Sequence, residues 1–164
     1  MSEVARQTEF SMLGSSFTGL RRAGSVESEP IDWIQGPHQT AGAGMSEVLA
    51  YHTTTMANTL NANIIVFTRH GNMPRLLAHY RPNARIFAFT DNEAVRRRLA
   101  IFYGVYPFKL GFEATADATF LKATAVLKQE GHLRAGDEVT LVQSGSAPIW
   151  RAGGTHTVSV RKVE

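Results

Sequence analysis

The sequence contains no cysteine among its 164 residues. Disulfide bonds, zinc sites with thiolate ligands and cysteine nucleophiles are therefore excluded. No apolar run approaches the roughly 20 residues that a membrane-spanning helix needs. Residues 1–20 also lack the apolar segment of a signal peptide. We therefore expect no membrane partner and no secretion signal within these residues.

Charged residues are also sparse. They make up 19% of the chain, and the formal net charge is +3. The only dense basic cluster is Arg96–Arg98, which is too short for a nucleic-acid-binding stripe. We interpret this cluster as the solvated face of a helix and expect no nucleic-acid partner.

The familiar motifs of catalysis are missing as well. No Gly-Lys-Ser/Thr follows the candidate phosphate turn, and no GxGxxG occurs. The six histidines lack metal-ligand spacing, and the acidic residues form no convincing magnesium pair. The segment Ser144–Ser146 resembles a nucleophile turn only faintly. These absences favour a regulatory or interaction domain without its own cofactor over a self-sufficient enzyme.

The most informative stretch that is present runs from Ala62 to Tyr80. Residues Ala62–Thr68 form a continuous apolar run rich in β-branched side chains, which is typical of a strand buried on both faces. A polar turn containing Gly71 follows, and Asn72–Tyr80 has apolar residues at helical spacing. The unpaired N–H groups at the start of that helix favour an anion.

The rest of the chain alternates predicted helices and strands. We expect helices over 45–61, 93–102 and 117–131. Their N-terminal caps are predicted to be Ser46, residues 90–93 and Asp117, respectively. We expect strands over 86–89, 105–110, 139–142 and 155–163. The apolar faces of the first and last of these helices are predicted to contain Met45, Val48, Leu49, His52, Met56 and Leu60, and Phe120, Leu121, Ala125 and Leu127, respectively. Val158, Val160 and Val163 alternate with polar residues, as in an edge strand. The pattern predicts a three-layer α/β/α domain with a mostly parallel five-stranded sheet and an antiparallel last strand at its edge.

A ligand in such a fold lies beyond the carboxyl ends of the strands. With the first strand central, the loops Thr68–Met73 and Gln143–Gly154 meet there. We predict that Arg69, Arg151, the backbone of Gly71 and Asn72 and the Thr68 hydroxyl bind a phosphate. The alternative is that both loops are simply tight connections.

Several segments together resemble a known family. Ile65–Gly71, Tyr80–Asn83, Ala88–Asn92 and Gly104–Pro107 resemble the C-terminal domain of pyruvate kinase, with matching order and spacing from about Met45 to Glu164. Residues 142–151 are most similar to the plastid isozymes of plants and algae. This resemblance implies a plastid (chloroplast) location, with a cytoplasmic one as the alternative.

The resemblance also implies what the parent protein does. The family converts phosphoenolpyruvate and ADP into pyruvate and ATP in a catalytic barrel, with magnesium and usually potassium, and the barrel's motifs do not occur here. We therefore expect a fragment that is inactive alone: residues 1–13 end the barrel, 14–44 form a linker or extended arm, and 45–164 form the regulatory domain. Its expected partners are the missing barrel and other pyruvate kinase subunits.

The resemblance points to the same turn for an effector. The family's loop reads Ser/Thr-x-Ser-Gly-x-Ser/Thr; here Thr68 and Gly71 are kept, but His70 and Met73 replace two hydroxyls. The Trp and Arg that hold a second phosphate fall near Phe112 and Thr119. We expect a small phosphorylated effector other than fructose 1,6-bisphosphate, or none. The candidate site residues are Thr68, Arg69, His70, Gly71, Asn72, Trp150, Arg151, Gly153 and Gly154. An independent anion-binding or sugar-phosphate-binding α/β domain and a doubly wound enzyme with an unrecognised site remain the alternatives.

Overall fold

The computed structural model describes residues 44–143, 149 and 156–164. The elements in chain order are α2 (Met45–Leu60), β1 (Asn63–Phe67), α3 (Asn72–His79), β2 (Ile86–Thr90), α4 (Glu93–Leu99), β3 (Val105–Lys109), α5 (Ala116–Gln129), β4 (Glu138–Gln143) and β5 (Thr157–Lys162). Residues 1–13, predicted to end the barrel, and the predicted arm over 14–44 up to residue 43 lie outside the described residues.

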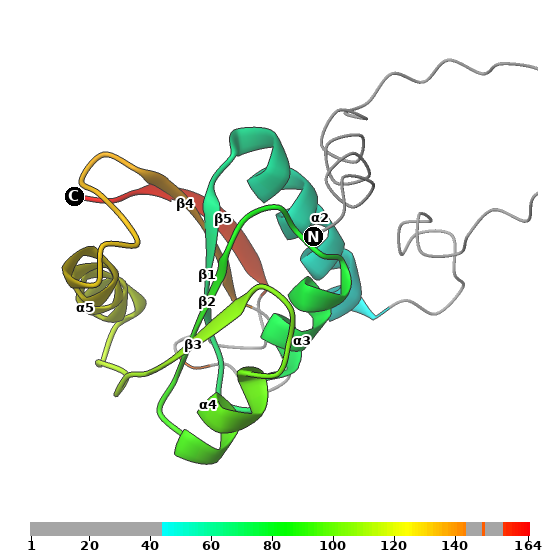
Figure 1. Ribbon diagram of the computed structural model, residues 1–164, viewed down its shortest axis with the longest axis horizontal. Coiled ribbons are helices and arrows are strands. Elements are labelled where there is room, and N and C mark those ends of the chain that lie inside the picture. Colours follow the sequence, from blue (N-terminus) through cyan, green and yellow to red (C-terminus); the bar gives the residue numbers. More distant parts are fainter. Residues whose placement is uncertain (1–43, 144–148, 150–155) are drawn as a thin grey trace, which may run out of the picture. The chain divides into compact units, whose positions relative to one another are not determined.

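The strands form one sheet in the order β3-β2-β1-β4-β5 (Figure 1). The pairs β1–β2, β2–β3 and β1–β4 are parallel, while β5 runs antiparallel to β4. Ile65 at the centre lies between Phe87 of β2 and Leu141 of β4. The predicted five-stranded sheet with an antiparallel edge strand is confirmed.

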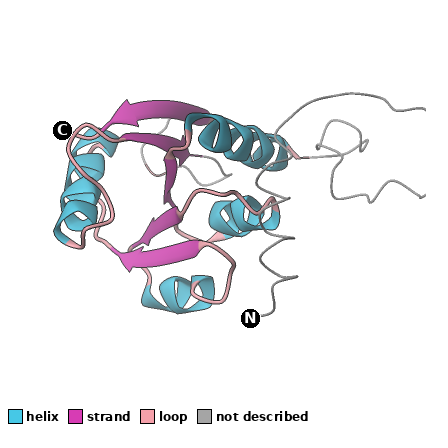
Figure 2. Ribbon diagram, turned by 45° about the horizontal axis from the view of Figure 1, so that its top comes forward, coloured by secondary structure: helices cyan, strands magenta, loops and turns pink. Residues whose placement is uncertain are grey.

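Helices cover the two faces of the sheet unequally (Figures 1 and 2). One apolar cluster joins the sheet to α2, α3 and α4, and the other joins it to α5. The chain moves outward from β1 to β3 and then crosses back to β4 on the other side of β1. Because such crossovers are right-handed, this reversal places α5 on the opposite face. The three-layer prediction is therefore confirmed.

Strand β1 is buried on both faces, as its continuous apolar sequence predicts. Ile64 and Val66 belong to the cluster under α2, α3 and α4, and Ile65 and Phe67 to the cluster under α5. None of the four is more than 4% exposed. The sheet centre is thus a rigid, water-free base from which the turn after β1 projects.

The predicted inward face of α2 is right only in part, since Leu49 packs half-buried against the apolar cluster but other predicted residues do not. Met45 and Leu60 are 59% and 43% exposed, and His52 is exposed as well. The buried residues are the small ones, namely Ala50, Thr53, Thr54 and Ala57. The strands on this face already supply branched side chains such as Ile64, Val66 and Val142, so small residues let the helix pack closely on them.

The caps of α2 were predicted only in part. Gly44, not Ser46, occupies the N-cap position, and no side chain caps this end. At the other end Asn61 takes a left-handed conformation with φ 50° and ends the helix as predicted.

The predictions for α5 also need correction. Its N-cap is Thr115, whose hydroxyl accepts a hydrogen bond from the Ala118 N–H at 3.2 Å, and not Asp117. Leu121 is 53% exposed and Ala125 is exposed. Phe120 and Leu127 are buried as predicted, and the smaller Thr119, Ala123 and Thr124 complete the buried set.

The edge strand differs from its prediction in one residue. Val163 is 1% exposed, as expected of an inward side chain, but Val160 is 43% exposed. Among the described residues β5 pairs only with β4, so little covers its outer side.

The described helices include none long and apolar enough to cross a bilayer.

Candidate functional site

The turn from β1 to α3 is held by the side chain of Thr68. The Thr68 N–H donates to the Phe89 carbonyl at 2.9 Å, which extends the sheet by one bond. The Thr68 hydroxyl then accepts a hydrogen bond from the Gly71 N–H at 2.9 Å, and Thr68 is only 8% exposed. A buried threonine therefore fixes the chain at the point where it leaves the sheet.

Gly71 is required at this turn for two reasons. Its φ of +82° is left-handed, which disfavours any residue with a Cβ. A Cβ at this position would also lie 3.2 Å from Leu99 Cδ2 and 3.3 Å from Val95 Cγ1. Helix α4 therefore packs directly against the turn, and glycine is the residue that leaves room for it.

Arg98 of α4 contacts this turn, which the sequence analysis did not predict. Its Nη2 donates a hydrogen bond to the His70 carbonyl oxygen. We interpreted Arg96–Arg98 as a solvated helix face; Arg98 is exposed, but it also contacts the turn. The helical spacing contained a signal, because Arg98 follows the buried Val95 by three positions and so flanks the inward face.

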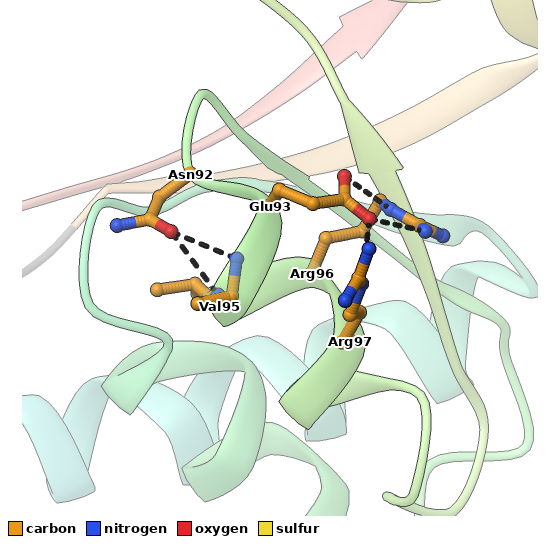
Figure 3. Close-up of polar contacts among 6 residues, drawn as sticks. Asn92, Glu93, Val95, Arg96 and Arg97 are labelled. Carbon is orange, nitrogen blue, oxygen red and sulfur yellow. Dashed lines mark hydrogen bonds and ion pairs between the residues drawn. The ribbon is translucent and has the colours of Figure 1, made fainter.

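Glu93 organises the other two arginines of this cluster (Figure 3). Its carboxylate lies 2.7 Å from Arg96 Nη2 and 3.1 Å from Arg97 Nε. The hydrogen bonds from Arg96, followed by that from Arg97, lower the pKa of the Glu93 carboxyl to about 2, while partial burial opposes the change. Two of the three positive charges are thus paired along α4, and Arg98 stands apart from them.

The start of α3 offers hydrogen-bond donors. No side chain caps this helix, and within the described residues the N–H groups of Asn72 and Met73 have no hydrogen-bond partner. Arg69, His70 and Asn72 are all exposed beside them. The Gly71 N–H, which we predicted as a phosphate donor, is already bonded to Thr68. An anion at this turn would therefore meet the N–H groups of Asn72 and Met73.

The second predicted loop follows β4. Because β1 and β4 are parallel neighbours, with Val66 beside Val142, their carboxyl ends lie at the same edge of the sheet. The candidate residues Trp150, Arg151, Gly153 and Gly154 lie outside the described residues. The convergence of Arg69 and Arg151 on one anion stays a prediction.

Phe112 and Thr119, near which the resemblance places two phosphate ligands, serve the fold. Thr119 is fully buried; its hydroxyl accepts from the Glu113 N–H at 2.9 Å and donates to the Thr115 carbonyl at 3.1 Å. The Phe112 ring packs edge-on against Phe67. Neither side chain offers a positive charge to a phosphate. In the part of the chain that the structure describes, no three His, Asp or Glu side chains gather closely enough to hold a metal ion.

Comparison with known proteins identifies the family. The family model described as "Pyruvate kinase, alpha/beta domain" matches residues 47–161, which is more than half of the chain. The chain belongs to the pyruvate kinase family. Its described sheet and helices form the C-terminal α/β domain of a pyruvate kinase, so an independent α/β domain of another family is not favoured.

Individual pyruvate kinases agree with this assignment. The chain is 50% identical over 138 residues to "Pyruvate kinase isozyme G, chloroplastic" of Ricinus communis, covering 84% of this chain and 33% of that protein. It is 48% identical over 119 residues to "Plastidial pyruvate kinase 2" of Arabidopsis thaliana, covering 73% and 21%. The solved structure "Cryptosporidium parvum pyruvate kinase in complex with ADP" superposes with a TM-score of 0.68 at 26% identity, covering 82% of this chain and 28% of that one. The chain thus spans a third or less of the length of these pyruvate kinases.

Proposed function

We propose that this chain is the regulatory and assembly domain of a pyruvate kinase that converts phosphoenolpyruvate and ADP into pyruvate and ATP. The observation that carries the proposal is the family match over residues 47–161, which coincides with the described sheet and helices. Residues 1–13 and 14–44 would be the end of a catalytic barrel and a connecting arm. Magnesium and potassium would then act in the barrel, outside this chain.

A coupled assay tests this division of labour. The 164-residue chain, given phosphoenolpyruvate, ADP, magnesium and potassium, should produce pyruvate no faster than the protein-free blank. A full-length plastid isozyme serves as the positive control. Protein-dependent turnover that survives repurification would contradict the proposal.

The proposed location is the plastid. It is supported by the relatives whose names place them there, from Ricinus communis and Arabidopsis thaliana. Antibodies raised against this chain should detect the parent protein in isolated plastids of the source cells. Detection in the cytoplasmic fraction alone would favour the alternative location.

The proposed effector site is the turn from β1 to α3, with an anion bound by Arg69, Arg151 and the first N–H groups of α3. The uncapped donors of Asn72 and Met73 and the exposed Arg69 support it. Because Phe112 and Thr119 serve the fold, a monophosphate suits the site better than a bisphosphate. A ligand at 100 times its dissociation constant should add about 2.7 kcal/mol to the free energy of unfolding.

The proposed partners in assembly are other pyruvate kinase subunits, which meet along the outer edge of β5. An edge strand presents unpaired backbone groups to a neighbour, and Val160 and Leu121 are 43% and 53% exposed beside it. Sedimentation at micromolar concentration should show a dimer that Val160→Lys weakens, whereas Tyr103→Lys, at a distant exposed position, should not. A wild-type monomer at every accessible concentration would contradict this.

A further inference from the structure

The peptide unit between His70 and Gly71 is held at both ends. Its carbonyl oxygen accepts a hydrogen bond from Arg98 Nη2, and its N–H donates to the Thr68 hydroxyl at 2.9 Å. The C=O and N–H of one peptide lie in a single rigid plane. Hydrogen bonds at opposite edges of that plane therefore fix its orientation.

The bond to the oxygen comes from a different structural element. Arg98 lies 28 residues further along the chain, on α4. Its neighbours Val95 and Leu99 lie against the same glycine, at 3.3 and 3.2 Å from the position of a Cβ on Gly71. The last turn of α4 thus packs on the β1–α3 turn and also supplies its polar contact.

Arg98 is available for this contact because its neighbours are engaged elsewhere. Glu93 binds Arg96 and Arg97, and within the described residues no carboxylate lies within ion-pair distance of Arg98. A guanidinium carries five N–H donors, and its contact with the His70 oxygen uses Nη2.

We propose that Arg98 is a positioning residue for the anion site and acts through the His70 carbonyl. The proposal rests on the proposed effector site. While Arg98 holds the His70 carbonyl oxygen, that oxygen stays beside α4. Gly71 then keeps the conformation that directs the N–H groups of Asn72 and Met73 toward the anion. Without Arg98, only the Thr68 bond holds the peptide plane among the described residues. The plane can then rotate and bring the partial negative charge of the oxygen toward these donors, where it repels an anion.

Titration of the 164-residue chain with inorganic phosphate tests the proposal, with affinity and amide NMR spectra recorded together. Arg98→Met keeps the aliphatic stem but removes the donors, and should weaken phosphate binding about fivefold to tenfold, the effect of one lost hydrogen bond. Arg98→Lys should restore most of the affinity. The matched control is Arg97→Met, one position away and bound to Glu93, which should change affinity by less than about twofold.

A second measurement separates positioning from simple attraction between charges. Without phosphate, Arg98→Met should shift the Gly71 amide resonance and speed its hydrogen exchange, whereas Arg97→Met should do neither. If Arg98→Met does not fold, Arg98→Gln replaces it, with an intermediate loss of affinity expected. The proposal would be overturned if the wild type binds phosphate and the Arg98 variants bind it with the same affinity. It would also be overturned if the Gly71 amide resonance and its exchange rate stay unchanged in Arg98→Met. Absence of phosphate binding by the wild type would instead overturn the effector site itself.

Discussion

The turn from β1 to α3 and the turn from β2 to α4 are built on the same plan. Each follows a buried parallel strand, and each has a threonine at the strand end that accepts a backbone hydrogen bond. Thr68 accepts from the Gly71 N–H at 2.9 Å, and Thr90 accepts from the Asn92 N–H at 3.3 Å. The two turns differ in what happens next, at the start of the helix.

The β2–α4 turn satisfies its own helix. The Asn92 side chain accepts hydrogen bonds from the Ala94 and Val95 N–H groups at 2.9 and 3.4 Å (Figure 3). The β1–α3 turn places Gly71 at the equivalent position, with no side chain to cap the helix. The first N–H groups of α4 are capped by a side chain, while those of α3 are not. The comparison therefore gives the β2–α4 turn a structural role and supports the binding role that we propose for the β1–α3 turn.

The largest expected effect comes from Gly71→Ala. The left-handed φ and the contacts of 3.2 and 3.3 Å with Leu99 and Val95 act together, so we expect a loss of about 2–4 kcal/mol in the free energy of unfolding. Gly104→Ala is the matched control, because Gly104 has φ +68° but no atom within 4 Å of a Cβ. Urea denaturation measures both; equal losses would show that α4 does not press on the turn.

Thr68→Val should have the next largest effect. It leaves the Gly71 N–H without its partner in a buried place and should cost about 1–3 kcal/mol. Thr90→Val removes the longer bond of the other turn and should cost less. Chemical denaturation of the two variants side by side measures both losses in the free energy of unfolding. A greater loss for Thr90→Val than for Thr68→Val would contradict this ranking.

Asn92→Ala tests the other side of the comparison. Loss of this cap should lower the free energy of unfolding by about 1 kcal/mol without changing phosphate affinity. The melting temperature and a phosphate titration of the same sample provide both values. A large loss of affinity would mean that the two turns are not separate in function.

The smallest expected effect is the pH dependence due to Glu93. Its pKa is lowered from 4.5 to about 2 by Arg96 and Arg97, so its contribution to stability is complete above about pH 4.5 and declines as the pH falls toward 2. The side chain is solvent-accessible and the effect is screened by salt. NMR titration of the Glu93 carboxyl carbon measures it directly, and a midpoint near 4.5 would show that the ion pairs do not form in solution.

The strands of the sheet were predictable because the evidence for them is local. The continuous apolar runs around Ile65 and Phe87 mark buried strands, and Asn61 marks a helix end. The inward faces of α2 and α5 were mispredicted in part, because Met45 and Leu121 are exposed. The closeness of helix and sheet, which favours Ala50 and Ala123 there, depends on packing between segments distant in sequence.

The candidate site shows the same limit. Thr68 and Gly71 could be assigned to a turn from their neighbours in the chain. The contact of Arg98 with His70 could not, because it depends on how closely α4 approaches the β1–α3 turn. Helical spacing from Val95 places Arg98 at the edge of the inward face of α4, but only the three-dimensional arrangement shows that it reaches the His70 carbonyl.

The central claim is that the β1–α3 turn binds an anion, and a thermal shift measurement tests it most directly. Wild type, Arg69→Ala and Asn92→Ala would be heated with sugar monophosphates, AMP or inorganic phosphate, with chloride at equal ionic strength as the control. We predict a rise in melting temperature for wild type and Asn92→Ala and none for Arg69→Ala, because a charge-assisted bond to phosphate is about twice as strong as a neutral one. No shift with any anion at millimolar concentration, or an undiminished shift in Arg69→Ala, would contradict the claim.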